Sequence, residues 1–185
     1  MGAVAPVCDF GWQAIDATLP GVDGQEHRIL GSGLNGGLVV AFICNHCPYV
    51  KAVVRRIVHD AAELRHHAVG FVAINANDAA SHPDDSFEKM KLFASTHGFG
   101  FPYLLDEDQS VARAYGAVCT PDFFGLNGNM QLQYRGRLDA SRKEAGVPGL
   151  RRDLFEAMVA VARSGEGPRE QIPSIGCSIK WKTEH

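Results

Sequence analysis

The 185-residue sequence lacks long apolar runs, contains little cysteine and has no strong excess of charge of either sign. Its longest apolar run, GLVVAFIC at residues 37–44, is far shorter than the stretch of about 20 residues that spans a bilayer as a helix. A net charge of −3 gives no bias toward nucleic acid or an anionic membrane. Residues 1–16 show neither the basic region nor the long apolar region of a secretory signal. We therefore expect a cytoplasmic protein without nucleic-acid or membrane partners.

Cysteine is sparse and odd in number. The five residues are Cys8, Cys44, Cys47, Cys119 and Cys177. A small secreted domain held together by disulfides is shorter and richer in cysteine. In a reducing compartment, closely spaced cysteines are more often catalytic, redox-sensing or metal-binding, which directs attention to the CNHC segment.

The apolar pattern alternates between strands and helices. Residues 37–43 and 69–75 are continuous apolar runs, which are typical of strands buried on both faces. Between them, residues 46–67 repeat apolar positions every three to four residues and predict a helix, with Pro48 tolerated in its first turn. This order predicts a right-handed parallel crossover.

The rest of the chain completes an α/β domain. Further helices are predicted at 83–97, 108–116 and 149–163. Asn127-Gly128 predicts a turn between two antiparallel strands. We expect a three-layer fold with a central mixed sheet and helices on both faces. It occupies residues 1–164, including an N-terminal β-hairpin extension at 8–36, and residues 165–185 form a C-terminal tail docked on it.

Cys44 and Cys47 lie where the first buried strand gives way to the helix. A thiolate there faces unpaired backbone N–H groups and the positive end of the helix dipole, which lowers its pKa. The spacing allows a disulfide across the first turn, with Cys44 as the accessible nucleophile and Cys47 as the more buried resolving thiol. His46 either carries positive charge that favours the thiolate or faces solvent without touching a thiol.

Two other interpretations of the pair stay open, as structural thiols or as half of a metal site. A structural zinc site needs four ligands, and no second pair of cysteines is present. Cys119 and Cys177 are single and distant in sequence. The pattern therefore favours redox chemistry.

Several segments together resemble one branch of the thioredoxin superfamily. They are FICNHCPYVKA, VAINANDAASHPDDSFEKM, FPYLLDEDQSVARAYGAVCTPDFF, YRGRLDASR and GCSIKWK. They resemble the peroxiredoxin-like group named for alkyl hydroperoxide reductase and thiol-specific antioxidant proteins, over nearly the whole chain. The resemblance implies a thioredoxin-like fold and catalysis by thiol exchange, with an external thiol as electron donor and no cofactor.

The resemblance also assigns residues. Cys44 and Cys47 match the thioredoxin redox pair, and Thr120-Pro121 matches the residue and cis-proline beside it. The alternative for Pro121 is a trans proline that opens an edge strand. Asp78 falls where the thiol reductases of cytochrome c maturation carry an acid near their disulfide, and its alternative is an aspartate that forms a turn.

Peroxiredoxins imply a different register. There Cys47, followed by Pro48, is the peroxidatic cysteine, and Cys44 replaces the family's threonine. Arg137 or Arg142 then stands for the arginine that holds peroxide. The chain also departs from thioredoxin. Six residues upstream of the pair, where thioredoxin has a buried acid, this sequence has Leu38. A proton acceptor must then come from elsewhere or from water.

Two further cysteines are candidates for additional redox roles. Cys119 directly precedes Thr120-Pro121, so the resemblance places it near the pair, as a third partner or as a packed small side chain. Cys177 lies in the tail. Either the tail folds back and offers Cys177 as a second resolving thiol, or the tail only anchors on the core or on a neighbouring subunit. Cys8 is expected to be incidental.

The sequence thus predicts a thiol–disulfide oxidoreductase that uses Cys44 and Cys47 on a protein thiol or disulfide partner. One alternative is a thiol-dependent peroxidase, in which Cys47 or Cys44 reacts with a peroxide through a sulfenic acid. The other is a non-enzymatic redox-sensing or metal-binding module. No resident metal or cofactor is expected. Whether the protein forms a homodimer stays open.

Overall fold

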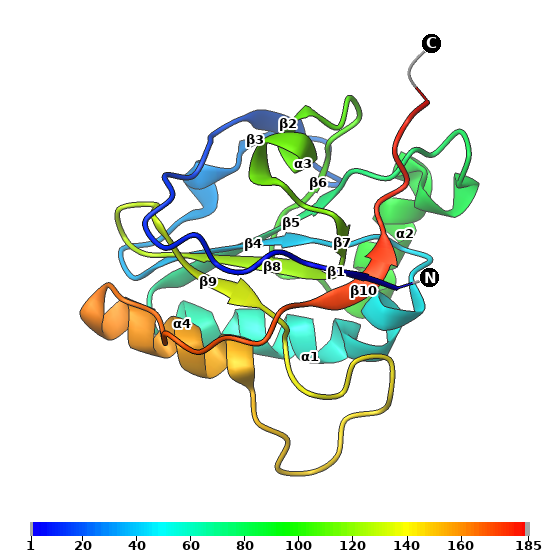
Figure 1. Cartoon of the computed structure of the whole chain (residues 1–185). Coiled ribbons are helices and arrows are strands. Elements are labelled where there is room, and N and C mark those ends of the chain that lie inside the picture. Colours follow the sequence, from blue (N-terminus) through cyan, green and yellow to red (C-terminus); the bar gives the residue numbers. More distant parts are fainter. Residues whose placement is uncertain (1, 184–185) are drawn as a thin grey trace.

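A mixed five-stranded sheet forms the centre of the computed structural model, which describes residues 2–183. In sheet order its strands are β6 (Tyr103–Leu105), β5 (Val69–Asn75), β4 (Gly37–Phe42), β8 (Asp122–Leu126) and β9 (Leu132–Gly136). β4 pairs in parallel with β5 and antiparallel with β8. The predicted parallel crossover and central mixed sheet are confirmed (Figure 1).

Helices cover both faces of this sheet, as predicted (Figure 1). Alternate residues of β4 enter opposite cores, because successive side chains of a strand point to opposite faces. One core contains Val39 and Ala41 with α1 (Pro48–Arg65), α2 (Phe87–His97) and α4 (Asp153–Ser164). The other contains Leu38 and Val40 with α3 (Ser110–Tyr115) and the N-terminal segment.

Several helix boundaries differ from the sequence predictions, most clearly at the starts of α1, α2 and α4. α1 begins at Pro48 rather than 46, because Cys47 has extended backbone angles and caps the helix. The helix predicted from 83 is a 3₁₀ turn, η2 (Pro83–Asp85), followed by α2, because Ser86 is extended between them. α4 begins only at Asp153, since Gly149 has a positive φ of 77°.

The hairpin between β8 and β9 uses a longer connection than a tight two-residue turn. Residues 127–131 lie between the strands. The Asn127 side-chain oxygen accepts hydrogen bonds from the backbone N–H groups of Asn129 and Gln131, both at 3.0 Å. This asparagine therefore organises the loop through its side chain.

Two small sheets complete the fold. β2 (Thr18–Pro20) and β3 (Glu26–Arg28) form an antiparallel hairpin within 8–36, followed by the 3₁₀ turn η1 (Leu30–Ser32). β10 (Ile175–Ser178) lies between β1 (Gly2–Val4) and β7 (Cys119–Thr120), so the first and last strands of the described chain pair with each other (Figure 1).

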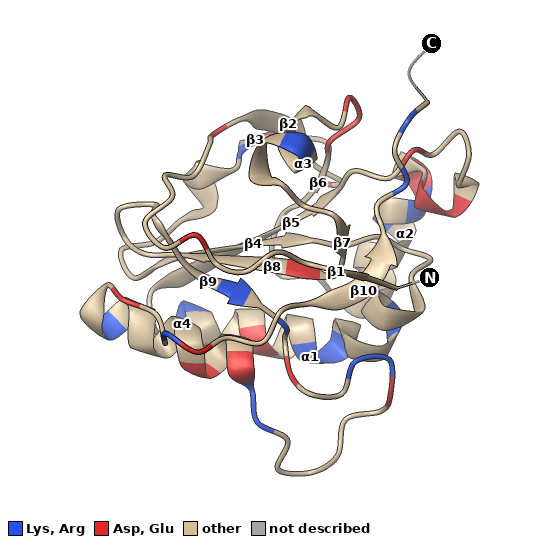
Figure 2. Ribbon diagram, in the orientation of Figure 1, with Lys and Arg blue, Asp and Glu red and all other residues tan. Residues whose placement is uncertain are grey.

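Charged side chains of both signs are spread over the molecule (Figure 2). One ion pair is buried inside the sheet, between Asp122 on β8 and Arg135 on β9 at 2.9 Å. Within residues 2–183, none of the helices combines the length and the apolar character that crossing a bilayer requires.

Candidate active site

Cys44 and Cys47 lie at the carboxyl end of the central strand β4, on the loop that leads into α1. Both side chains are buried, with 0% of each exposed. The expectation that Cys44 is the accessible thiol is therefore wrong. The loop residues Asn45 and His46 turn toward Asp85 on the neighbouring η2 segment instead of leaving Cys44 at the surface.

Thr120 connects the two thiols. Its hydroxyl Oγ1 lies 3.3 Å from Cys44 Sγ, and its carbonyl oxygen lies 3.2 Å from Cys47 Sγ. The peptide bond between Thr120 and Pro121 is cis. The structure thus places Thr120-Pro121 beside the cysteine pair, where the family resemblance implied.

The electrostatic environment favours the thiolate on Cys47. A hydrogen bond from Cys44 lowers the pKa of Cys47 to about 5. Cys177 and the Val50 N–H lower this pKa as well, whereas burial raises it. The Thr120 carbonyl accepts the Cys47 proton in the thiol form and opposes ionisation, but the donors outweigh it.

Cys44 experiences the opposite environment. The hydrogen bond to Cys47 raises the pKa of Cys44, and burial and the negative charge of Asp85 raise it further. The sequence predicted Cys44 as the nucleophile, but the surrounding groups favour Cys47. The physical reason is position: Cys47 directly precedes the first turn of α1, where the helix dipole favours negative charge, whereas the charge of Asp85 acts on Cys44.

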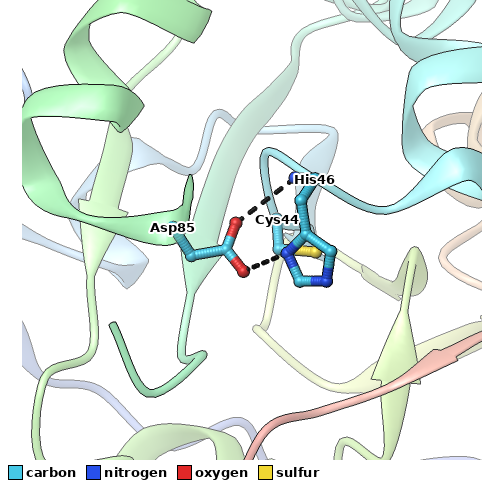
Figure 3. A group of neighbouring side chains, drawn as sticks. All are labelled: Cys44, His46 and Asp85. Carbon is cyan, nitrogen blue, oxygen red and sulfur yellow. Dashed lines mark hydrogen bonds and ion pairs between the residues drawn. The ribbon is translucent and has the colours of Figure 1, made fainter. Parts of the chain in front are cut away.

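Asp85 is fully buried and organises the loop between the cysteines (Figure 3). One carboxylate oxygen accepts the backbone N–H groups of Asn45 at 2.8 Å and His46 at 3.3 Å. The other accepts from His46 Nδ1 at 2.5 Å and from Asn77 Nδ2 at 2.7 Å. The carboxylate therefore has a protein partner on each side and fixes the loop conformation.

His46 is bonded to Asp85 and also stacks on His82, with ring centroids 5.4 Å apart. Ligand atoms of Cys44, His46 and Asp85 lie within 4.8 Å of one another, so these three are the residues that could hold a metal ion. The carboxylate already accepts four donors, and a metal would have to displace the His46 nitrogen. The donor set fits a hydrogen-bonded network better than a metal centre.

Several residues of this network were not predicted as site residues. Tyr103 donates to Asn45 Oδ1 at 2.9 Å, and Asn75 Nδ2 donates to the Asp85 carbonyl at 3.3 Å. From the sequence, Asp85 is predicted only as part of the helix at 83–97. A polar residue two positions after Pro83 gives no local sign that it folds onto a loop 40 residues upstream.

Three predicted residues lie outside the contacts of the cysteine pair. Asp78 is partly exposed and accepts hydrogen bonds from Ala80 and Ser81, so the turn-forming alternative describes its contacts. Arg137 donates to Asp153 at 2.8 Å. Neither Arg137 nor Arg142 is hydrogen-bonded to either cysteine within the described part of the chain, although both line a pocket next to Pro121.

Leu38 is buried in the apolar core, as expected for a position that lacks the thioredoxin acid. The buried acid beside Cys44 is Asp85. It comes from η2 rather than from β4.

The remaining cysteines have different surroundings. Cys119 is buried, burial raises its pKa, and its sulfur lies 3.9 Å from the Pro121 carbonyl oxygen. Cys177 is half-buried on β10 and packs against the core cluster that contains the pair. Cys8 packs on the opposite side of the sheet from the pair.

The chain has two cysteines, separated by two residues, at the start of a helix, and a cis-proline beside them on a mixed sheet. These features place it among proteins with the thioredoxin-like fold. The sequence matches the AhpC/TSA family over residues 10–138, so the chain belongs to this family. Family and fold together indicate a redox function of the oxidoreductase class.

Solved structures agree with this fold. An uncharacterized conserved protein of Geobacillus kaustophilus is 42% identical, with a TM-score of 0.92 over 100% of this chain and 98% of that one. A secreted disulfide oxidoreductase of Mycobacterium tuberculosis homologous to E. coli DsbE is 19% identical, with a TM-score of 0.59 over 78% and 95%. The peroxidoxin BcpB of the same organism is 18% identical, with a TM-score of 0.61 over 84% and 96%. No protein with a curated description matches the sequence significantly.

Proposed function

We propose that the protein is a thiol–disulfide oxidoreductase whose redox centre is the pair Cys44 and Cys47. The observation that carries this proposal is the contact of both sulfurs with the same residue, Thr120. Two thiols held this close can exchange two electrons by forming one disulfide.

In this mechanism Cys47 is the attacking thiolate. It attacks a sulfur of a disulfide substrate, forms a mixed disulfide and releases the first substrate thiolate. Cys44 then loses its proton and attacks the Cys47 sulfur, which closes the Cys44–Cys47 disulfide and releases the second thiolate. The adjacent His46–Asp85 pair supports this proton loss, because it is the ionisable group next to Cys44.

An external thiol returns the pair to the reduced state, and no cofactor takes part. The reducing cytoplasm is the compartment that suits such a cycle. Because both sulfurs are buried, a substrate reaches them only when the loop 44–46 moves or when another group carries electrons to the surface.

A thiol-dependent peroxidase is the second candidate. It is supported by the lowered pKa of Cys47 and by Pro48 directly after it. The Cys47 thiolate would attack a peroxide to give a sulfenic acid and an alcohol or water. Cys44 would then condense with it to the disulfide and release water. Against it, Arg137 is paired with Asp153 rather than with the thiolate.

The rates of oxidation of reduced protein by hydrogen peroxide and by glutathione disulfide distinguish the two functions. For an oxidoreductase we expect the Cys44–Cys47 disulfide to form readily with glutathione disulfide, and peroxide to react no faster than with a free thiol of similar pKa. Rapid peroxide consumption through a trapped sulfenic acid on Cys47 would instead establish the peroxidase. Cys8→Ser is the matched control, because it removes a half-buried thiol on the other face of the sheet.

A further inference from the structure

A third thiol lies against the redox pair. Cys177 is on β10, directly opposite Thr120 of β7 in the antiparallel register. Residues directly opposite in antiparallel strands project to the same face of the sheet, with Cβ atoms about 5 Å apart. Because the Thr120 hydroxyl touches Cys44, the Cys177 side chain points to the side of the sheet that holds the pair.

Packing agrees with this direction. Cys177 packs against the core cluster that contains both buried cysteines, and its proximity lowers the pKa of Cys47. Gly176 allows this approach, because a Cβ on it would lie 1.9 Å from the Thr120 carbonyl oxygen. The strand is therefore held as close to Thr120 as its backbone permits.

Exposure separates Cys177 from the pair. Cys44 and Cys47 are both 0% exposed, whereas Cys177 is half-buried. Cys177 is thus the one of these three cysteines that solvent reaches in part, and it lies next to the buried pair.

We propose that Cys177 relays electrons from an external thiol donor to the buried Cys44–Cys47 disulfide, a role that rests on the redox function proposed above. In the first step the Cys177 thiolate attacks the Cys47 sulfur. The Cys44–Cys47 bond breaks, a Cys47–Cys177 bond forms, and Cys44 leaves as a thiolate that takes up a proton. No net oxidation occurs in this exchange.

In the second step a donor thiolate attacks the accessible Cys177 sulfur. Cys47 leaves as the thiolate, and this direction is favoured because a sulfur of low pKa is the better leaving group. A second donor thiol then releases Cys177 and completes the donor disulfide. Two donor thiols are oxidised and the Cys44–Cys47 disulfide is reduced, so atoms and electrons balance.

The neighbouring charge suits this order of steps. Burial and the adjacent Cys47 thiolate raise the pKa of Cys177 to about 11 in the reduced protein. When Cys47 is in a disulfide it carries no charge, so its contribution disappears. Cys177 therefore ionises more easily when a disulfide is present for it to attack.

The test uses the full chain with reduced glutathione as the donor. Oxidised wild type and Cys177→Ser, each carrying the Cys44–Cys47 disulfide, are reduced while the remaining disulfide is followed by alkylation and mass spectrometry. We expect Cys177→Ser to be reduced at least about tenfold more slowly than wild type, and Cys8→Ser to match wild type. Cys177→Ala repeats the test with a smaller side chain.

A trapping experiment addresses the intermediate directly. In Cys44→Ser, oxidation by glutathione disulfide is expected to give an intrachain Cys47–Cys177 disulfide. If Cys177→Ser forms the Cys44–Cys47 disulfide and loses it at the wild-type rate, the relay is wrong and the oxidoreductase stands. If wild type never forms the Cys44–Cys47 disulfide, the proposed function fails and the relay fails with it.

Discussion

His46 and Asp85 are joined by a hydrogen bond of 2.5 Å between Nδ1 and a carboxylate oxygen, and the same carboxylate accepts the His46 backbone N–H. The histidine between the two cysteines is thus tied to an acid on another element. This pairing holds the loop over Cys44 and determines how the thiols are presented.

The first prediction concerns this buried acid. Asp85→Asn places an amide N–H₂ against groups that also donate, so at least one buried donor loses its acceptor. We expect the free energy of unfolding to fall by about 3 kcal/mol. We also expect Cys44 to react faster with an alkylating agent, because the loop loosens and a negative charge is removed. Urea unfolding and alkylation kinetics measure the two effects.

Asp84→Asn is the control for this experiment. Asp84 is exposed, and its interaction with the loop uses its backbone carbonyl, which accepts from Asn45. Stability and alkylation rate should both stay at wild-type values. Equal destabilisation by the two variants would contradict the role assigned to the Asp85 carboxylate.

The ionisation of Cys47 gives a second prediction. Because its pKa is lowered to about 5, the reduced protein should carry one thiolate at neutral pH and lose it as the pH falls through about 5. The ultraviolet absorbance of the thiolate follows this titration without requiring access to the buried sulfur. Cys47→Ser should abolish the transition, and Cys44→Ala should move it to higher pH by removing the principal donor. A transition that survives in Cys47→Ser would assign the thiolate to another cysteine.

Gly176 allows a third prediction, about the position of β10. A Cβ at this position would lie 1.9 Å from the Thr120 carbonyl oxygen, so Gly176→Ala must push β10 away. We expect a loss of about 1–3 kcal/mol in the free energy of unfolding, as for other overpacked sites. Gly100→Ala is the control, because a Cβ there meets nothing within 4 Å. If both variants are as stable as wild type, the close approach of β10 to Thr120 is wrong.

Asp122 gives a fourth prediction, about pH. Burial raises its pKa from 3.8 to about 6, although Arg135 opposes this. The pKa of Asp122 is higher in the folded than in the unfolded protein, so its protonated form contributes to the free energy of unfolding. This contribution is fully present below about pH 4 and is lost as the pH rises through about 6. We expect wild type to lose about 3 kcal/mol relative to Asp122→Asn between pH 4 and 7. Urea unfolding of both proteins across this range provides the measurement, and a difference that stays flat would contradict the shift.

Local sequence signals predicted the strands and helices that carry the site. The apolar run of β4, the periodicity of α1 and the Cys44–Cys47 spacing are properties of neighbouring residues. The family resemblance added Thr120-Pro121. These are the features for which pattern and fold agree.

Other features of the site depend on contacts between distant segments. Asp85 reaches the cysteine loop across 40 residues, and Cys177 reaches Cys47 through the pairing of β10 with β7. The pKa values of the two thiols depend on these neighbours, so the sequence alone does not decide which cysteine carries the thiolate. A terminal strand and a polar turn carry no local pattern that announces such contacts.

The most direct test of the redox pair is a titration of the protein in glutathione redox buffers, with thiols counted and located by alkylation and mass spectrometry at each point. We expect a single two-electron transition in wild type, assigned to a Cys44–Cys47 disulfide. Cys47→Ser should lose this transition, and any disulfide that Cys44→Ser forms should map to Cys47 and Cys177. Cys8→Ser should titrate as wild type does. A wild-type protein that keeps both thiols reduced in the most oxidising buffer would contradict the proposed function.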